Sequence, residues 1–214
     1  MVGCLRSPYR LVAFDLDGTL VKQVSGWKTL HQYFGTEMAV GVNLADYERG
    51  EIDYAEFMRR DIALWPKPLH ITTIERALAD YTLAGGAAGV VGDLRERGFE
   101  VAIVSGGIDL LANRVAERLA IRLTAANGFV IDGDGYLTGE GILRVDPINK
   151  HLALERLAQG MGLTLNDCVA VGDGKFDENF LRCAGLGVAL GSDVKLRRAA
   201  QAAIPNLEEL LRLL

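Results

Sequence analysis

The stretch from residue 10 to residue 20, RLVAFDLDGTL, constrains this chain more than any other. Its apolar run, Leu11 to Phe14, predicts a buried strand of a parallel sheet, and the glycine and threonine that follow indicate a turn. Asp15 and Asp17 stand at the carboxyl end of that strand, where open α/β sheets bind their ligands. Because strand side chains alternate, two acids one residue apart point to the same side while the extended geometry lasts.

Two carboxylates held this close repel each other. The pair therefore indicates a bound cation, a shared proton or an anionic ligand held through a metal. On its own, the pattern is equally consistent with an acidic loop after a strand. The rest of the chain has to decide between these interpretations.

Composition excludes several classes of protein. The chain has 214 residues, is 50% hydrophobic and carries a net charge of −5. Its basic residues are scattered rather than clustered, so we expect no nucleic-acid partner. No apolar run reaches the length of a membrane span, and no secretory signal pattern opens the chain. Three cysteines at irregular spacing predict neither a disulfide framework nor a zinc site, so we expect a soluble cytoplasmic protein with no membrane partner.

The segment from 25 to 84 differs from the rest of the chain in its hydrophobic pattern. Trp27, Leu30, His31 and Phe34 recur at three- and four-residue intervals, as amphipathic helices require. The segment carries no strand signal, so we predict a helical insert of about sixty residues. The predicted domains are therefore a core formed by residues 1–24 and 85–214, and a helical cap formed by residues 25–84.

After the insert, strands and helices alternate. The predicted strands are 100–104, 168–171 and 187–190, and the predicted helices are 74–81 in the insert, then 90–97, 108–119, 150–161, 177–183 and 206–214. Residues 127–145 indicate a β-hairpin on an Asp-Gly-Asp-Gly turn. This alternation predicts an α/β fold with a doubly wound, Rossmann-like parallel sheet.

Three further polar groups follow predicted strand ends or open a helix. Ser105, Gly106 and Gly107 form a predicted turn at a helix start, where amides suit an anion. Lys150 begins a helix and adds a positive charge, and Asp173 follows the next strand. Three carboxylates together favour a hard cation, of which Mg²⁺ is the best match. A cation, amides and a lysine around a carboxylate predict a site for phosphoryl transfer.

The chemistry suggests a role for each acid. Asp15 lies nearer the rigid strand, which makes it the better nucleophile for forming an aspartyl-phosphate. Asp17 is then the better acid and base, giving a proton to the leaving oxygen and later activating water. Asp173 would complete the metal site.

Four motifs together resemble those of the haloacid dehalogenase-like hydrolases: FDLDGTL from residue 14, VSGG from residue 104, Lys150, and GDG-xx-D from residue 172. The resemblance implies that Asp15 is the nucleophile, that Asp17 is the acid and base, and that Ser105 and Lys150 hold the phosphate. It further implies a metal bound by Asp15, Asp173 and the backbone carbonyl of Asp17.

The remaining assignments rest on the same resemblance. Asp177 matches a later acid of the fourth motif and is expected to support the metal site. We add Thr19 and Gly106 to the predicted phosphate site. The helical insert and the 127–145 hairpin resemble the phosphoserine-phosphatase-like branch of the family.

The sequence departs from that branch where the substrate is recognised. Val24 stands where phosphoserine phosphatases place a glutamate for the substrate ammonium, and Phe176 stands where they place an asparagine. Arg59 or Arg60, on the predicted cap, could match the arginine that grips a substrate carboxylate. The resemblance therefore implies the chemistry while leaving the substrate open.

We thus expect a Mg²⁺-dependent phosphomonoester hydrolase acting on a small phosphorylated metabolite. A phosphotransferase that passes the phosphoryl group to an alcohol is the alternative. A third hypothesis is a signalling domain that is phosphorylated on aspartate. Asp17 and the cap both argue against it. The sequence leaves open whether the chain forms a homodimer.

Overall fold

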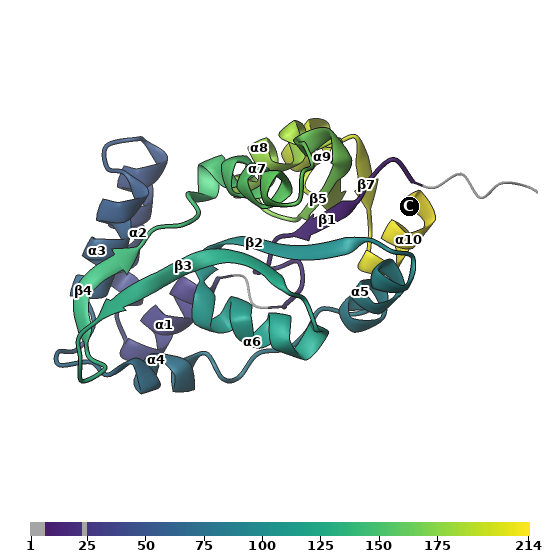
Figure 1. The fold of residues 1–214 in the computed structure, drawn as a ribbon. Coiled ribbons are helices and arrows are strands. Elements are labelled where there is room, and N and C mark those ends of the chain that lie inside the picture. Colours follow the sequence, from purple (N-terminus) through teal and green to yellow (C-terminus); the bar gives the residue numbers. More distant parts are fainter. Residues whose placement is uncertain (1–6, 23–24) are drawn as a thin grey trace, which may run out of the picture.

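The computed structural model describes residues 7–22 and 25–214, and it is built on one seven-stranded sheet (Figure 1). The strand order is β4-β3-β2-β1-β5-β6-β7, and all neighbouring strands are parallel except β4, which runs antiparallel to β3 at one edge. The strands are β1 (Leu11–Phe14), β2 (Glu100–Ile108), β3 (Leu123–Ile131), β4 (Leu137–Ile142), β5 (Cys168–Gly172), β6 (Leu186–Leu190) and β7 (Ala202–Ile204). This sheet confirms the predicted α/β class, with the opening strand at its centre.

Helices cover both faces of the sheet (Figure 1). One face carries α5 (Ala87–Glu96), α6 (Asp109–Leu119) and α10 (Leu210–Leu213), and the other carries α7 (Lys150–Gly160), α8 (Glu178–Cys183) and α9 (Val194–Ala199). The alternation of β1 explains this arrangement, because Val12 and Phe14 join one hydrophobic cluster while Leu11 and Ala13 join the other. The sheet is therefore doubly wound, as predicted.

Four helices lie between β1 and α5, and we call them the cap helices: α1 (Gly26–Phe34), α2 (Glu37–Glu48), α3 (Tyr54–Ala63) and α4 (Ile71–Ala77). The Ser25 hydroxyl caps α1 by accepting from the Lys28 amide at 3.3 Å. The cap also packs on the hairpin of β3 and β4, where the Phe129 ring meets the rings of Trp27 and Trp65 edge-on, with centroids 5.9 and 5.7 Å apart. The cap helices thus pack on the antiparallel edge of the sheet, and residues 25–84 remain our proposed cap boundary.

Some elements differ from those predicted. Residues 105–107 were expected to form a turn, which is wrong, because β2 continues through them to Ile108. Its ladder with β3 shifts register between Val104, which pairs with Ala125, and Ile108, which pairs with Asn127, so the strand bulges between these two pairs. Helix α4 covers 71–77 rather than 74–81, and the short strand β7, which includes two alanines, was not predicted. Among the described residues, no helix combines the length and apolar character needed to cross a membrane.

Candidate active site

A tight turn at the end of β1 joins that strand to the end of β5. The Leu16 carbonyl accepts from the amides of Thr19 at 3.3 Å and Leu20 at 3.0 Å, which folds the chain back sharply. Gly18 has φ of +86°, and a Cβ there would lie 2.2 Å from Asp173 Oδ2. Only glycine fits such a position without strain. The Thr19 hydroxyl donates to Asp173 Oδ1 at 2.7 Å, so this turn fixes the position of the acid that follows β5.

Lys150 lies at the centre of the buried polar groups. Its Nζ donates to Asp15 Oδ1 and to Asp177 Oδ1, each at 2.6 Å, and all three side chains are buried. Asp177 Oδ2 accepts from the amides of Asp173 at 3.1 Å and Gly174 at 3.0 Å. The lysine therefore connects the nucleophile candidate on β1 to the loop after β5.

Three carboxylates at this edge of the sheet suit a metal ion. Asp15, Asp173 and Asp177 can each offer one oxygen such that these atoms all lie within 4.8 Å of one another. Hard divalent cations prefer such oxygen ligands, so the donor set fits one. The sequence had placed Asp177 beside the metal site, and the cluster of side-chain oxygens includes it. Asp17 was expected to bind through its backbone carbonyl, a ligand that lies outside a cluster of side chains, so that role stays a prediction.

Burial makes this cluster of charges unfavourable without a further cation. Burial raises the pKa of Asp15 well above its ordinary value, the charge of Asp177 raises it further, and Lys150 opposes both. Burial also raises the pKa of Asp173. Burial alone would lower the pKa of Lys150, but the charges of Asp15 and Asp177 raise it above its ordinary value. One lysine among these acids leaves excess negative charge, which a bound metal would neutralise.

Asp17 faces the same space from the other side of the β1 turn. Burial raises its pKa to about 6, while a hydrogen bond with the Gly26 backbone and the charge of Lys150 oppose the rise. Its Oδ1 is buried and has no hydrogen-bond partner among residues 7–22 and 25–214. A carboxyl group with a raised pKa and a free oxygen is suited to giving a proton near neutral pH.

The bulge in β2 forms a cradle next to these acids. Ser105 is 1% exposed, and its Oγ accepts from the Gly107 amide at 2.9 Å. The Gly106 carbonyl accepts from Asn127 Nδ2 at 2.9 Å and from the Tyr54 hydroxyl at 2.7 Å. Asn127 and Tyr54 were missed in the sequence, although a lone amide inside the apolar run 125–130 could have drawn attention to Asn127.

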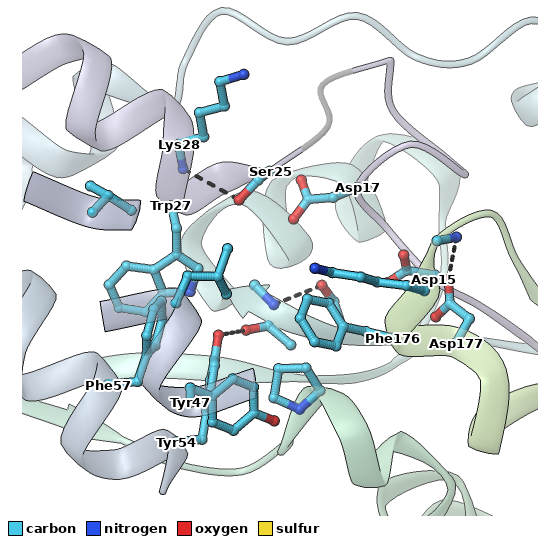
Figure 2. A pocket seen from close by; sticks show the side chains of 18 of the residues that line it. Asp15, Asp17, Ser25, Trp27, Lys28, Tyr47, Tyr54, Phe57, Phe176 and Asp177 are labelled. Carbon is cyan, nitrogen blue, oxygen red and sulfur yellow. Dashed lines mark hydrogen bonds between the residues drawn. The ribbon is translucent and has the colours of Figure 1, made fainter. Parts of the chain in front are cut away.

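A cavity of about 550 Å³ opens over these groups (Figure 2). Among the predicted site residues, its lining includes Asp15, Asp17, Ser105, Gly106, Lys150, Asp173 and Asp177. Thr19 lies beneath Asp173, fully buried, instead of in the lining.

The two predicted cap arginines lie elsewhere. Arg59 pairs with Glu56 at 2.8 Å, and Arg60 pairs with Glu56 at 2.7 Å and with Asp46 at 3.0 Å. Neither arginine lines the cavity in the structure. Val24, the other substrate-recognition position, falls outside the described residues.

Comparison with known proteins agrees with this arrangement. The family described as haloacid dehalogenase-like hydrolase matches residues 9–185. The chain belongs to the haloacid dehalogenase-like hydrolases.

Relatives of this hydrolase are named phosphoserine phosphatases. That of Methanocaldococcus jannaschii is 32% identical, and the match covers 95% of this chain and 96% of the relative. That of Streptomyces coelicolor is 33% identical over 99% of this chain, which spans only 52% of that longer relative. A solved phosphoserine phosphatase, described as a phospho-aspartyl intermediate analogue, has a TM-score of 0.81 and 32% identity, with 96% of this chain and 99% of that chain covered.

Proposed function

We propose that this hydrolase cleaves a phosphomonoester of a small metabolite through an aspartyl-phosphate on Asp15. The observation that carries the proposal is the buried Asp15 carboxylate, held at 2.6 Å by Lys150, in the same cavity as Asp17. The names of the relatives, and the intermediate analogue among the solved structures, support the same chemistry.

Each group has a part in the first step. A carboxylate oxygen of Asp15 attacks phosphorus, the bond from phosphorus to the ester oxygen breaks, and Asp17 gives its proton to that oxygen. Lys150 and the hydroxyl and amides of the 105–107 bulge bind the phosphoryl oxygens, whose charge would otherwise repel the acids. The leaving alcohol departs neutral.

In the second step, Asp17 acts as a base. It takes a proton from a water molecule, whose oxygen attacks phosphorus and displaces the Asp15 carboxylate. Inorganic phosphate is released, and both aspartates return to their starting protonation states. The raised pKa of Asp17, about 6, allows both directions of proton transfer near neutral pH.

We propose Mg²⁺ as the metal, bound by Asp15, Asp173 and Asp177. When bound, it would neutralise negative charge on the acids and on the phosphoryl group. Thr19 would hold Asp173 in position through its 2.7 Å hydrogen bond. The small metabolites that this chemistry serves make the cytoplasm our proposed location.

The test is phosphate release from an aryl phosphate and from phosphoserine, with Mg²⁺ and with EDTA. We expect metal-dependent release in the parent protein and at least about a thousandfold loss in Asp15→Asn, because the nucleophile is gone. Asp93→Asn changes an exposed carboxylate on α5 and serves as the matched control. Activity that survives Asp15→Asn or EDTA would refute the proposal.

The same assay separates hydrolysis from transfer. Alcohol acceptors are added, and the products are followed with labelled phosphate. Phosphorylated alcohol in place of free phosphate would identify a phosphotransferase. Light scattering on the same sample measures whether the chain is a homodimer.

A further inference from the structure

The cavity has two ends of opposite character. The acids lie on the core side of the cavity, and most of its aromatic side chains lie on the cap side, while Phe176 lies between them beside Asp15 (Figure 2). Four of these come from the cap helices and one from the loop after β5, and they are Trp27, Tyr47, Tyr54, Phe57 and Phe176. We call these five residues the aromatic wall.

The rings of the aromatic wall pack against each other. Tyr54 stacks on Phe57 at 5.0 Å, Trp27 meets Phe57 edge-on at 5.7 Å, and Tyr47 lies 5.1 Å from Tyr54. Phe176 joins the group from the core side, 6.2 Å from Tyr47. The wall therefore spans the space between cap and core, where a leaving group would lie.

The tyrosine hydroxyls of this wall are already engaged. Tyr54 donates to the Gly106 carbonyl at 2.7 Å, and Tyr47 donates to Asp146 while accepting from the Ile148 amide at 3.3 Å. The indole Nε1 of Trp27 is buried and has no hydrogen-bond partner among the described residues. Apart from this one donor, the wall offers apolar ring surface to a ligand.

Two lysines of the lining are engaged in ion pairs. Lys150 is held between Asp15 and Asp177, and Lys175 pairs with Glu48. The ring of His31, also in the lining, hydrogen-bonds to Asp61 Oδ2 through Nε2 at 3.1 Å.

The rest of the lining offers little to a charged leaving group. Lys28 is exposed, and Figure 2 shows its side chain extending away from the aromatic wall. Glu37 is exposed too. Within the described part of the chain, no arginine lines the cavity. A substrate carboxylate placed beside the aromatic wall would thus lose water without gaining a charged partner there.

We propose that the cavity selects phosphomonoesters of bulky apolar alcohols, which the aromatic wall binds, over phosphoesters whose alcohol carries charged groups. This inference rests on the proposed hydrolase function and names its substrate class. Cavities of roughly 300–1,000 Å³ enclose ligands much larger than a three-carbon amino acid. The observed volume of about 550 Å³ lies within that range.

Phe176 is the side chain that tests this selection most directly. It is partly buried, and it contributes to the wall from the core side, on the loop that also carries Asp173 and Asp177. Lys175 Nζ lies 5.1 Å from its ring centroid and pairs with Glu48. Replacing the ring with a polar amide should weaken binding of an apolar alcohol while giving nothing to a charged one.

The experiment compares kcat/KM for phenylpropyl phosphate, ethyl phosphate and O-phosphoserine, which all release alkyl alcohols. We expect phenylpropyl phosphate to exceed both others by at least about tenfold, the usual scale of discrimination in an apolar pocket. Phe176→Asn should reduce the ratio of phenylpropyl to ethyl phosphate by about tenfold, and Phe176→Leu by less. Tyr33→Asn removes an exposed cap aromatic outside the lining and should leave the ratio unchanged.

Each outcome decides the question. A preference for O-phosphoserine, or an unchanged ratio in Phe176→Asn, overturns the inference while the hydrolase function stands. If the folded parent protein hydrolyses none of the three esters or an aryl phosphate, the proposed function falls and the inference with it. If Phe176→Asn fails to fold, the test uses Phe176→Leu and inhibition of the parent protein by phosphonates. We then expect phenylpropylphosphonate to inhibit more strongly than ethylphosphonate, and equal inhibition overturns the inference.

Discussion

Asn127 offers a sharp test of how the fold holds the β2 bulge. Its side chain is 1% exposed and makes four hydrogen bonds: Nδ2 donates to Gly106 O at 2.9 Å and Val145 O at 2.8 Å, and Oδ1 accepts from the amides of Arg144 at 2.8 Å and Val145 at 2.9 Å. One amide thus fastens the bulge to the segment that leads toward Lys150. We therefore choose Asn127→Ala as the perturbation.

The expected loss follows from what remains unpaired. Gly106 O keeps the Tyr54 hydroxyl, and the Arg144 amide belongs to an exposed residue that water can reach. The buried Val145 loses partners for both its amide and its carbonyl. Leaving a buried polar group unsatisfied costs about 1–3 kcal/mol, so the two groups together predict a loss of about 4 kcal/mol in unfolding free energy.

Urea unfolding, followed by circular dichroism, measures this loss. Asn113→Ala is the matched control, because Asn113 is exposed and its Oδ1 accepts an exposed hydrogen bond from Thr124 Oγ1 at 3.1 Å. The control should lose less than about 0.5 kcal/mol. A loss below about 1 kcal/mol in Asn127→Ala, at an unchanged urea slope, would refute the reasoning. The variant's kcat should also fall, because Gly106 would lose one of its two anchors.

Three further predictions concern the acids and the cap. Burial raises the pKa of Asp17 from 3.8 to about 6, so the folded state binds a proton at this carboxyl more tightly than the unfolded state does. Ionised Asp17 therefore destabilises the folded state, and this destabilisation grows as the pH rises from about 4 to about 6. In metal-free protein, Asp17→Asn should therefore raise the unfolding free energy by about 3 kcal/mol at about pH 8 and by less than about 1 kcal/mol near pH 4; equal effects at both would contradict this. Gly18→Ala places a Cβ 2.2 Å from Asp173 Oδ2, whereas Gly35→Ala, at φ +67°, meets no atom within 4 Å. Both should lose about 1–2 kcal/mol from backbone strain, but only the Gly18 variant should bind Mg²⁺ more weakly by calorimetry, and equal affinities would count against the contact. Glu48→Gln breaks an exposed ion pair with the loop after β5, so we expect less than about 1 kcal/mol of destabilisation together with faster product release; an unchanged release rate would show that this pair does not restrain the cap.

Local patterns in the sequence predict most strands of the sheet and the turn after β1. The apolar run of β1, bounded by acids and glycine, predicts a buried central strand because burial on both faces leaves no polar position in it. The same rule predicts β5 and β6. It could not predict β7, since a three-residue strand containing two alanines has too little apolar pattern to stand out.

The 105–107 segment shows where local reasoning fails. Two successive glycines after a strand usually indicate a turn, yet here β3 supplies a partner whose register accommodates a bulge. Glycine permits both conformations, so the neighbouring strand decides between them. Pairing with β3, a later segment of the chain, thus determines the shape of the anion cradle.

The cap arginines show a second limit. The sequence places Arg59 and Arg60 on a cap helix, but the helix face that each side chain occupies, and the partners it finds, depend on packing. Glu56 lies three and four residues earlier on the same helix, and both arginines pair with it. The selectivity of the cavity is therefore proposed from its aromatic wall, which forms only when cap and core meet.

The sequence by itself determined the fold class, the family resemblance and the types of group at the strand ends, because strand burial and turn chemistry are local properties. Only the tertiary structure decided that Asp177 joins the acid cluster, that Asn127 anchors Gly106, and that Phe176 faces the cap aromatics across one cavity. These are contacts between segments distant along the chain. Their distances depend on how the sheet and the cap helices pack, which no local pattern specifies.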